Sequence, residues 1–134
     1  MSTLVDSNVL IDVLSEDERW FGWSSQALAR AVESSALCIN PIIYAEVAVG
    51  YASAAAVNQA LAEEQFERLA LPYAAGFLAG RAFVDYRRRG GVRQAPLPDF
   101  YIGAHAMVEN HTLLTRDPAR YRTYFPKLKL ICPE

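Results

Sequence analysis

The sequence predicts an α/β fold, in which helices pack on a mostly parallel central β-sheet. Short β-rich runs alternate with longer helical patterns from one end of the chain to the other, and this alternation is typical of parallel sheets. Hydrophobic residues make up 52% of the 134 residues, which is enough to build a substantial core. A chain of this length is most simply one domain, here residues 1–134.

The chain begins with a strand-to-helix transition. A β-rich run that starts at Thr3 ends at Asp6, and the residues Val9–Leu14 read as a short helix that Asn8 can cap. We therefore expect the carboxylate of Asp6 at the carboxyl end of the first strand.

A second transition of the same kind follows. Ser24–Glu33 has the pattern of an amphipathic helix, and Ala36–Ile39 that of a buried strand. Asn40 is a suitable N-cap, and Pro41 is favoured at the first position of a helix. This predicted helix contains Glu46.

The second half of the chain continues the alternation. Glycine residues, prolines and β-branched runs mark its boundaries. In order, we expect an Ala-rich stretch with a helix ending at Glu63-Glu64, a strand-like run over Phe66–Leu71, a long helix from Tyr73 toward Arg89 stopped by Gly90-Gly91, a loop over Val92–Leu97, a helix from Pro98 with Asp99 in its first turn, a strand over Thr112–Thr115, a short helix from Pro118, and a last strand over Leu128–Cys132.

Four carboxylates lie inside apolar segments: Asp6, Glu46, Asp99 and Asp117. Burying an ionised carboxylate is costly unless its charge is compensated. In parallel sheets, functional sites gather beyond the carboxyl ends of the strands, and all four positions can reach that edge. Brought together, they would form an oxygen-rich cluster suited to a hard divalent cation such as Mg²⁺.

Each acid also has a structural interpretation. Asp117 directly precedes Pro118 and could be a helix N-cap, and Asp99 is favoured in a first turn by the helix dipole. Asp6 could simply end its strand. Glu46 is the hardest to explain structurally, because it shares an apolar helix face with Val49 and has no evident cationic neighbour.

Other titratable residues fit a functional site less well. Asp12, Asp85 and Glu33 have polar neighbours on helical segments, so we expect them on solvated faces. His105 and His111 lack the spacing of metal ligands and an evident nucleophile, so we expect surface or hydrogen-bonded histidines outside the site.

The basic residues are concentrated in one place. The formal net charge of −2 gives no global reason to expect a nucleic-acid partner. The run of arginines before the Asp99 loop could be a solvated helix end or could contact phosphates, and the two interpretations stay open. These residues are Arg87, Arg88, Arg89 and Arg93.

The two cysteines, Cys38 and Cys132, lie in apolar strand-like contexts without a metal-binding pattern, so we expect reduced core thiols. We find no charged-then-apolar leader, and the longest apolar stretch is interrupted by Glu46 and Gly50. The sequence therefore predicts a cytoplasmic protein without a membrane-spanning segment.

Four segments together resemble the PIN-domain ribonucleases, in particular the VapC-type toxins of bacterial toxin–antitoxin pairs. They are D-S-N-V-L-I-D, P-I-I-Y-A-E-V, R-R-R-G-G followed by P-L-P-D-F-Y-I-G-A-H-A, and L-L-T-R-D-P-A-R-Y-R-T-Y-F-P. The resemblance extends essentially over the whole chain. It implies a three-layer α/β/α sandwich, with Asp6 and Asp99 as principal Mg²⁺ ligands, Glu46 and Asp117 completing the cluster, and Asn8 and Thr115 as auxiliary polar residues.

The same resemblance implies a Mg²⁺-dependent endoribonuclease, in which Mn²⁺ can substitute, and a cognate antitoxin that binds the toxin and blocks its site. It also implies a homodimer. Trp20, Phe21 and Trp23 precede an amphipathic helix and could line an apolar groove for the antitoxin, or could belong to the core.

Rival classes fit less well. A receiver-like phosphoacceptor domain needs adjacent acids after the first strand and a lysine before the last helix, and a haloacid-dehalogenase-like phosphatase needs an aspartate at the position of Asn8. A PIN-fold RNA-binding module without toxin activity is a further alternative.

Overall fold

The computed structural model describes residues 2–134, which form five strands and seven helices. Their order is β1 (Ser2–Val5), α1 (Ser7–Leu14), α2 (Phe21–Ser34), β2 (Ala36–Ile39), α3 (Pro41–Ala48), α4 (Ala54–Ala60), β3 (Glu67–Arg68), α5 (Tyr73–Arg88), α6 (Pro98–Val108), β4 (Thr112–Leu114), α7 (Ala119–Tyr124) and β5 (Leu130–Ile131).

The five strands form one sheet in the order β3-β2-β1-β4-β5, and every neighbouring pair is parallel. The central strand β1 pairs with β2 on one side and β4 on the other, with Leu4 opposite Cys38 and Leu113. The prediction of a mostly parallel sheet is confirmed.

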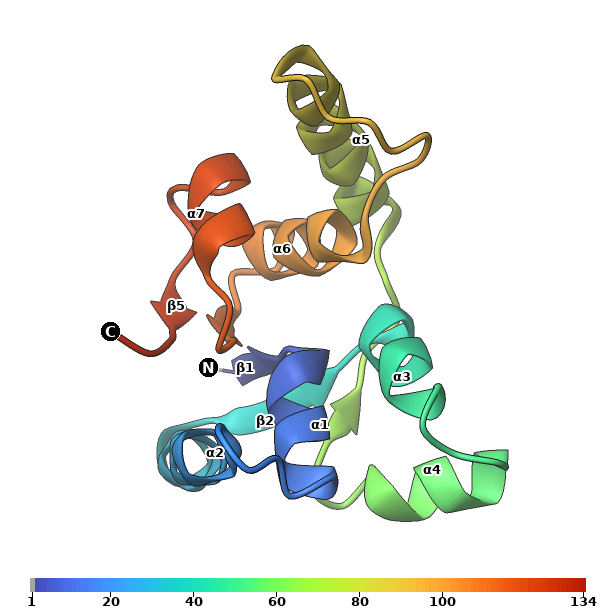
Figure 1. Cartoon of the computed structure of the whole chain (residues 1–134), viewed down its shortest axis with the longest axis vertical. Helices are drawn as coiled ribbons and strands as arrows, with labels where there is room; N and C mark the ends of the chain where they lie inside the picture. Colours follow the sequence, from blue (N-terminus) through green and yellow to red (C-terminus); the bar gives the residue numbers. More distant parts are fainter. Residues whose placement is uncertain (1) are drawn as a thin grey trace.

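Helices cover both faces of the sheet (Figure 1). The helices α5, α6 and α7 lie on one side of the strands, and α1, α2 and α4 lie on the other, which gives the three layers of the expected sandwich. The side chains of Leu4, Ile39 and Leu113 are fully buried between the layers, as is Phe100 on α6. Apolar residues of both sheet faces are buried, as expected where helices cover a parallel sheet.

Local sequence signals set several element boundaries. Asn40 caps α3, because its side-chain oxygen accepts a hydrogen bond from the backbone N–H of Ile43, and Pro41 is the first helical residue. Gly90, with a φ of +93°, follows the end of α5, where a residue with a Cβ would be strained.

Two caps differ from those that the sequence suggested. Helix α1 begins earlier than expected, and its cap is Asp6 rather than Asn8; the Asp6 carboxylate accepts a hydrogen bond from Ser7 N–H. Helix α7 begins at Ala119, with Pro118 at the cap position and without a side-chain cap, so Asp117 does not cap it. Instead of capping a helix, the Asn8 side chain donates to Thr115 after β4, and the Asp117 side chain is exposed to solvent.

Both cysteines are free thiols, as expected. Cys38 is fully buried, but Cys132 is only partly buried and accepts a hydrogen bond from the Arg122 guanidinium, so its predicted place in the core is wrong. The edge strand β5 is too short to bury it. Across residues 2–134, no helix combines the length and the apolar character needed to cross a membrane.

Candidate active site

The candidate site lies at the carboxyl ends of β1 and β4. The chain runs from β1 outward to β2 and β3 and then returns to the other side of β1 with β4, so the strand order reverses between β1 and β4. In open parallel sheets, ligands bind at such a reversal. Asp6 directly follows β1 and Thr115 directly follows β4, and the Thr115 hydroxyl donates to Asp6 Oδ2 at 2.9 Å.

Asp6 is buried and surrounded by neutral donors. It is 3% exposed, its Oδ1 accepts from Ser7 N–H at 2.8 Å, and its Oδ2 also accepts from the Tyr121 hydroxyl at 2.9 Å. Asn8 Nδ2 contributes a longer contact of 3.4 Å to the same oxygen. No cationic side chain bonds to this carboxylate among the described residues, so its charge is hydrogen-bonded but uncompensated.

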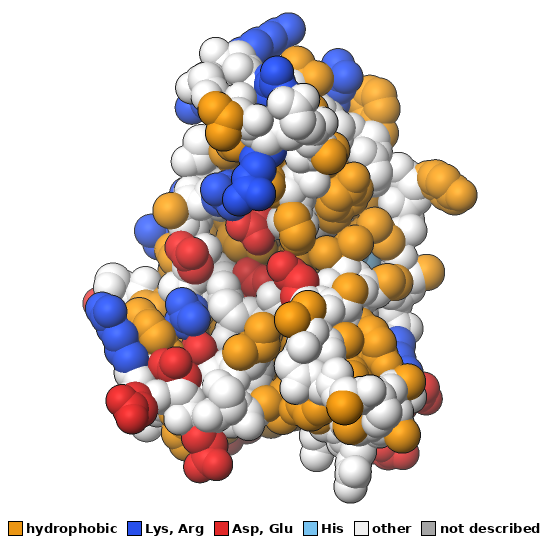
Figure 2. Space-filling view, turned by 45° about the vertical axis from the view of Figure 1, so that its right-hand side comes forward, with side chains coloured by type: hydrophobic (Ala, Val, Ile, Leu, Met, Phe, Trp, Pro, Cys, Tyr) orange, Lys and Arg blue, Asp and Glu red, His pale blue; other side chains and the backbone are white. Residues whose placement is uncertain are grey.

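Two further acids approach Asp6. The Ser7 hydroxyl donates to Glu46 Oε1 at 2.8 Å, and the Tyr121 hydroxyl lies 3.4 Å from Asp99 Oδ1. Asp6, Glu46 and Asp99 are therefore linked through Ser7 and Tyr121. Figure 2 shows acidic side chains gathered in the middle of one face, below basic side chains toward the α5 end.

The electrostatics of the site reflect this crowding. Burial raises the pKa of Asp6 to about 6; the charges of Asp99 and Glu46 act in the same direction, and the Thr115 and Tyr121 hydrogen bonds act against it. Burial, and secondarily the charge of Asp99, also raise the pKa of Glu46. Burial and the neighbouring acids raise the pKa of Tyr121 well above its usual range, so its hydroxyl stays a donor.

Asp117 stands apart from this group. Its side chain is exposed, and only its backbone N–H reaches the site, by donating to Thr115 Oγ1 at 3.2 Å. Among the described residues, no hydrogen bond or ion pair joins its carboxylate to the other acids. Asn8 is better placed, because its Nδ2 donates to Thr115 Oγ1 at 3.2 Å and its Oδ1 accepts from the backbone of Arg116.

The environment of Glu46 differs from the expected buried helix face. Glu46 is half-buried, whereas Val49 is 86% exposed and Gly50 is also exposed. Helix α3 ends at Ala48, so these two residues are not on its buried side. Glu46 therefore reaches the site through Ser7 while remaining accessible to solvent.

Three residues of this site were missed by the sequence analysis: Ser7, Tyr121 and Arg120. Ser7 lies inside the D-S-N segment, which is a local signal that could have been used. Arg120 and Tyr121 also lie inside a segment quoted for the family resemblance, but their contacts are distant in sequence. Tyr121 contacts Asp6 over 115 positions, and Arg120 Nη1 contacts Asp99 Oδ2, at 3.1 Å, over 21.

Asp12 is not on a solvated face, contrary to the expectation. It is 1% exposed, and its Oδ2 lies 2.7 Å from Arg116 Nε and accepts from the Ser24 hydroxyl at 2.8 Å. The compensating cation is 104 positions away in the sequence, on the segment that follows β4. This partly buried ion pair connects α1 to the segment that follows β4, next to the candidate site.

Two of the four arginines before the Asp99 loop have hydrogen-bond or ion-pair partners within the chain. Arg89 pairs with Asp85 at 3.1 Å, and Arg87 donates to the backbone oxygen of Arg93 at 2.8 Å. Arg88, the last residue of α5, and Arg93, in the loop that follows, are exposed. Whether these residues contact a substrate stays a prediction.

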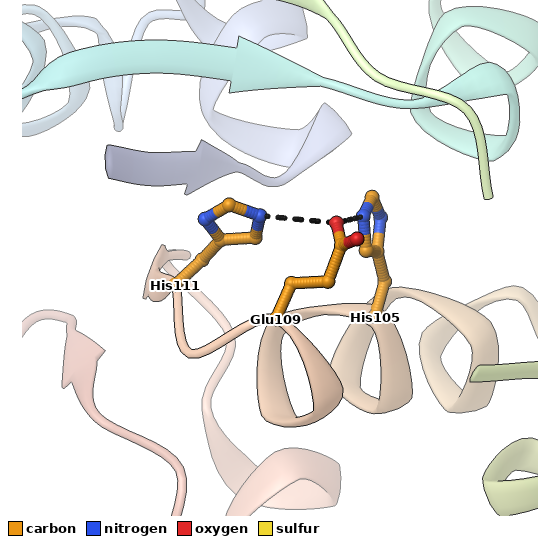
Figure 3. A group of neighbouring side chains, drawn as sticks. All are labelled: His105, Glu109 and His111. Carbon is orange, nitrogen blue, oxygen red and sulfur yellow. Dashed lines mark hydrogen bonds and ion pairs between the residues drawn. The ribbon is translucent and has the colours of Figure 1, made fainter. Parts of the chain in front are cut away.

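His105, Glu109 and His111 form a second cluster, at the end of α6 and the start of β4 (Figure 3). Nε2 of His105 lies 2.8 Å from Glu109 Oε1, and Nε2 of His111 lies 3.5 Å from it. Asn40 uses its oxygen to cap α3, so its Nδ2 donates to Nδ1 of His105 at 2.9 Å. The proton of the neutral His105 ring is then on Nε2, which donates to Glu109.

His105 therefore has no free lone pair for a metal ion, although the cluster has ligand-like spacing. Burial lowers the pKa of His105 and keeps the ring neutral. The cluster is a hydrogen-bonded group in which His105 is buried and Glu109 is exposed. The hydrogen-bonded state of His105 agrees with the expectation, and the position of the histidines outside the active site stays a prediction.

Sequence comparison connects this geometry to a known family. The sequence model of the PIN domain matches residues 3–126, which is most of the chain. The protein belongs to the PIN domain family. The expected family membership is confirmed, and the buried Asp6 lies within the matched range. A comparison with curated proteins gave no significant match.

Solved structures with the same fold include three bacterial complexes. VapBC2 from Rickettsia felis, bound to a promoter DNA fragment, has a TM-score of 0.74 at 18% identity, and VapBC-1 from nontypeable Haemophilus influenzae has 0.73 at 19%. A toxin–antitoxin complex from Klebsiella pneumoniae has 0.68 at 24%. In all three cases the alignment covers 98% of this chain and 98% of the other. The three-layer PIN-like fold is thereby confirmed.

Proposed function

We propose that this PIN domain protein is a Mg²⁺-dependent endoribonuclease and the toxin of a toxin–antitoxin pair. The observation that carries the proposal is the convergence of Asp6, Glu46 and Asp99, from three separate elements, at the reversal of strand order. Their position matches the place where parallel sheets bind ligands. The similarity to solved toxin–antitoxin complexes supports the biological role.

The donor set fits a hard divalent cation. Mg²⁺ prefers oxygen ligands and is usually held by one or two carboxylates together with water and substrate phosphate. Asp6 and Asp99 would hold the ion and Glu46 would complete the set, and Mn²⁺ could substitute. Asp117, which is exposed next to Thr115, would contribute from the rim of the site. The raised pKa values of Asp6 and Glu46 support this assignment, because a cation would relieve the repulsion that contributes to them.

A divalent ion held by these residues would supply Lewis-acid polarisation of a phosphate oxygen and would lower the pKa of a bound water. The chain's own residues have separate tasks. Thr115 and Asn8 orient the Asp6 carboxylate, and Ser7 ties Glu46 to the same position. Arg120, paired with Asp99 and partly exposed, is available to a phosphate of the substrate. Glu46 is accessible enough to orient a water.

Cleavage of RNA tests the proposal. We expect cleavage with Mg²⁺ or Mn²⁺, none with EDTA, and a loss of about 10²-fold or more in Asp6→Asn and Asp99→Asn, which each remove one ligand charge. Glu46→Gln and Asp117→Asn should reduce turnover less. Asp85→Asn is the matched control, because this aspartate pairs with Arg89 on the surface of α5.

Full cleavage by a folded Asp99→Asn protein would reject the mechanism. RNA binding without cleavage under any metal would instead favour the alternative of an RNA-binding module. Because the Asp85→Asn control has the same chemistry, general damage by removing an aspartate is separated from loss of the site.

An antitoxin is the expected protein partner. An apolar cavity of about 460 Å³ lies between α1, α2 and α4, lined by Leu14, Val32 and Phe66 among others. A helix of the antitoxin with an apolar face would fit such a groove. Trp23 is instead half-buried against the core on the other side of α2, so we place the antitoxin on this groove rather than on the predicted aromatic residues.

A homodimer is also part of the proposal. Tyr73 is 99% exposed and Phe77 is 71% exposed, one helical turn apart on α5. Exposed aromatic side chains on one helix face are typical of a contact surface. Light scattering of the wild-type protein and of Phe77→Glu tests this, and a monomer at high concentration in both would reject it.

A further inference from the structure

The hydroxyl of Tyr121 occupies a special position between two acids of the site. It donates to Asp6 Oδ2 at 2.9 Å and lies 3.4 Å from Asp99 Oδ1, while the residue as a whole is only 1% exposed. Asp6 follows β1, Asp99 is in the first turn of α6, and Tyr121 is on α7. The hydroxyl therefore lies between the carboxylates that the two elements carry and donates its proton to Asp6.

The packing of α7 on α6 brings the hydroxyl to this place. Gly103, one turn after Asp99 on α6, leaves room for the rings of α7. A Cβ built there would lie 2.6 Å from the Phe125 ring and 3.1 Å from the Tyr121 ring. The absence of a side chain at position 103 thus allows Tyr121 to approach α6 closely enough for its hydroxyl to reach both acids.

We infer that Tyr121 is a positioning residue, which orients the Asp6 carboxylate toward Asp99 in the arrangement that binds the divalent cation. This inference rests on the proposed metal-dependent function. A hydroxyl donates a single proton, and here it is directed at one oxygen of Asp6, so the carboxylate is fixed in rotation. Asp6 Oδ1, which accepts only from Ser7 N–H, keeps a free lone pair.

The physical reason is the same as at other metal centres. Carboxylates that bind metals are themselves hydrogen-bonded, and the loss of such an outer partner typically weakens metal affinity by about 10- to 100-fold. Without the Tyr121 hydroxyl, Asp6 keeps its donors Ser7 and Thr115 but loses the donor that lies between it and Asp99, so the repulsion between the two carboxylates is less opposed. The cation would then have to restore the arrangement on binding.

Direct measurement of Mn²⁺ binding by calorimetry tests the inference. Tyr121→Phe keeps the buried ring and removes only the hydroxyl, so we expect a folded protein with at least about 10-fold weaker Mn²⁺ binding. Tyr124→Phe is the matched control on the same helix. Its ring packs against Phe100, with 5.1 Å between the centroids, and its affinity should stay at the wild-type value.

The outcomes separate the two proposals. If the wild-type protein binds no Mn²⁺, the proposed function itself fails. If the wild type binds and Tyr121→Phe binds equally or more tightly, the proposed function stands and the positioning role is rejected. Melting in EDTA identifies general destabilisation, and a positioning role requires that the loss of affinity in Tyr121→Phe exceed that in Tyr124→Phe when both fold at the assay temperature.

Discussion

Two aspartates at opposite ends of α1 are almost equally buried but have opposite surroundings. Asp6 is 3% exposed and Asp12 is 1% exposed. Asp12 pairs with the Arg116 guanidinium at 2.7 Å and accepts from Ser24. Asp6 accepts only from neutral groups and has Glu46 and Asp99 as charged neighbours.

Burial alone does not distinguish these two aspartates, whereas the compensation of their charges does. The charge of Asp12 is compensated by Arg116 within the chain. The charge of Asp6 has no such partner among the described residues, and in the proposed function a metal ion would compensate it. Arg116 also lies over the Trp20 ring, at 5.4 Å from its centroid, so the ion pair fixes the segment after β4.

The largest expected effect concerns the pH dependence of stability without metal. The pKa of Asp6 is raised from 3.8 to about 6 in the folded state, so between these values the folded state binds more protons than the unfolded state. Stability therefore falls as pH rises from about 4 to about 6, by up to about 3 kcal/mol. Denaturation in EDTA should show this fall in the difference between wild type and Asp6→Asn. A pH-independent difference would mean that the charge of Asp6 is compensated after all.

Metal binding should offset the destabilisation that repulsion among the clustered acids causes. At a Mg²⁺ concentration of about 100 times the dissociation constant, selective binding to the folded state adds about 2.7 kcal/mol. We expect Asp99→Asn to lose most of this rise, yet to melt at an equal or higher temperature than wild type in EDTA, because one repelling charge is gone. Thermal melts with and without Mg²⁺ measure both. A clearly lower melting temperature in EDTA would make Asp99 chiefly a first-turn residue that stabilises α6.

Neutralising Asp12, in contrast to Asp99, should lower the stability of the protein. Asp12→Asn leaves Arg116 without its partner, and we expect a loss of about 2 kcal/mol, with or without Mg²⁺. Asp85→Asn breaks an exposed pair with Arg89 and should cost less than about 0.5 kcal/mol. Urea denaturation of the three proteins compares them. Equal stability of Asp12→Asn and wild type would remove the contrast between the two buried aspartates.

The smallest effect concerns the arginines that have no partner in the acid cluster. Replacing Arg87, Arg88, Arg89 and Arg93 by Ala should weaken RNA binding and flatten its salt dependence, by about 0.7 in slope for each RNA phosphate that these side chains neutralise. Binding is measured in an Asp99→Asn background, where the RNA is not cut. Because Arg87 and Arg89 have partners within the chain, we expect Arg88 and Arg93 to carry most of the effect. An unchanged slope would leave Arg120 as the better candidate for binding the substrate.

The regular elements could be predicted because their signals are local. The strand Ala36–Ile39 was predicted with its observed bounds, and Asn40, Pro41 and Gly90 mark the neighbouring helix ends through backbone preferences that depend on a few residues. The solvated position predicted for Asp12 was wrong for the opposite reason. Its partner is 104 positions away, and no local pattern contains it.

By itself, the sequence determined the alternation of strands and helices and the parallel sheet, and it predicted that four acids, Asp6, Glu46, Asp99 and Asp117, could meet at the carboxyl edge of that sheet. Apolar periodicity and capping depend on neighbours along the chain, so they can be read without a structure. Only the tertiary structure decided which of these acids meet and through which side chains. In the folded chain Tyr121 donates to Asp6, Asp117 is exposed, and Arg116 pairs with Asp12. Hydrogen bonds and charge compensation depend on distances in space between residues far apart in sequence, so no local pattern contains them.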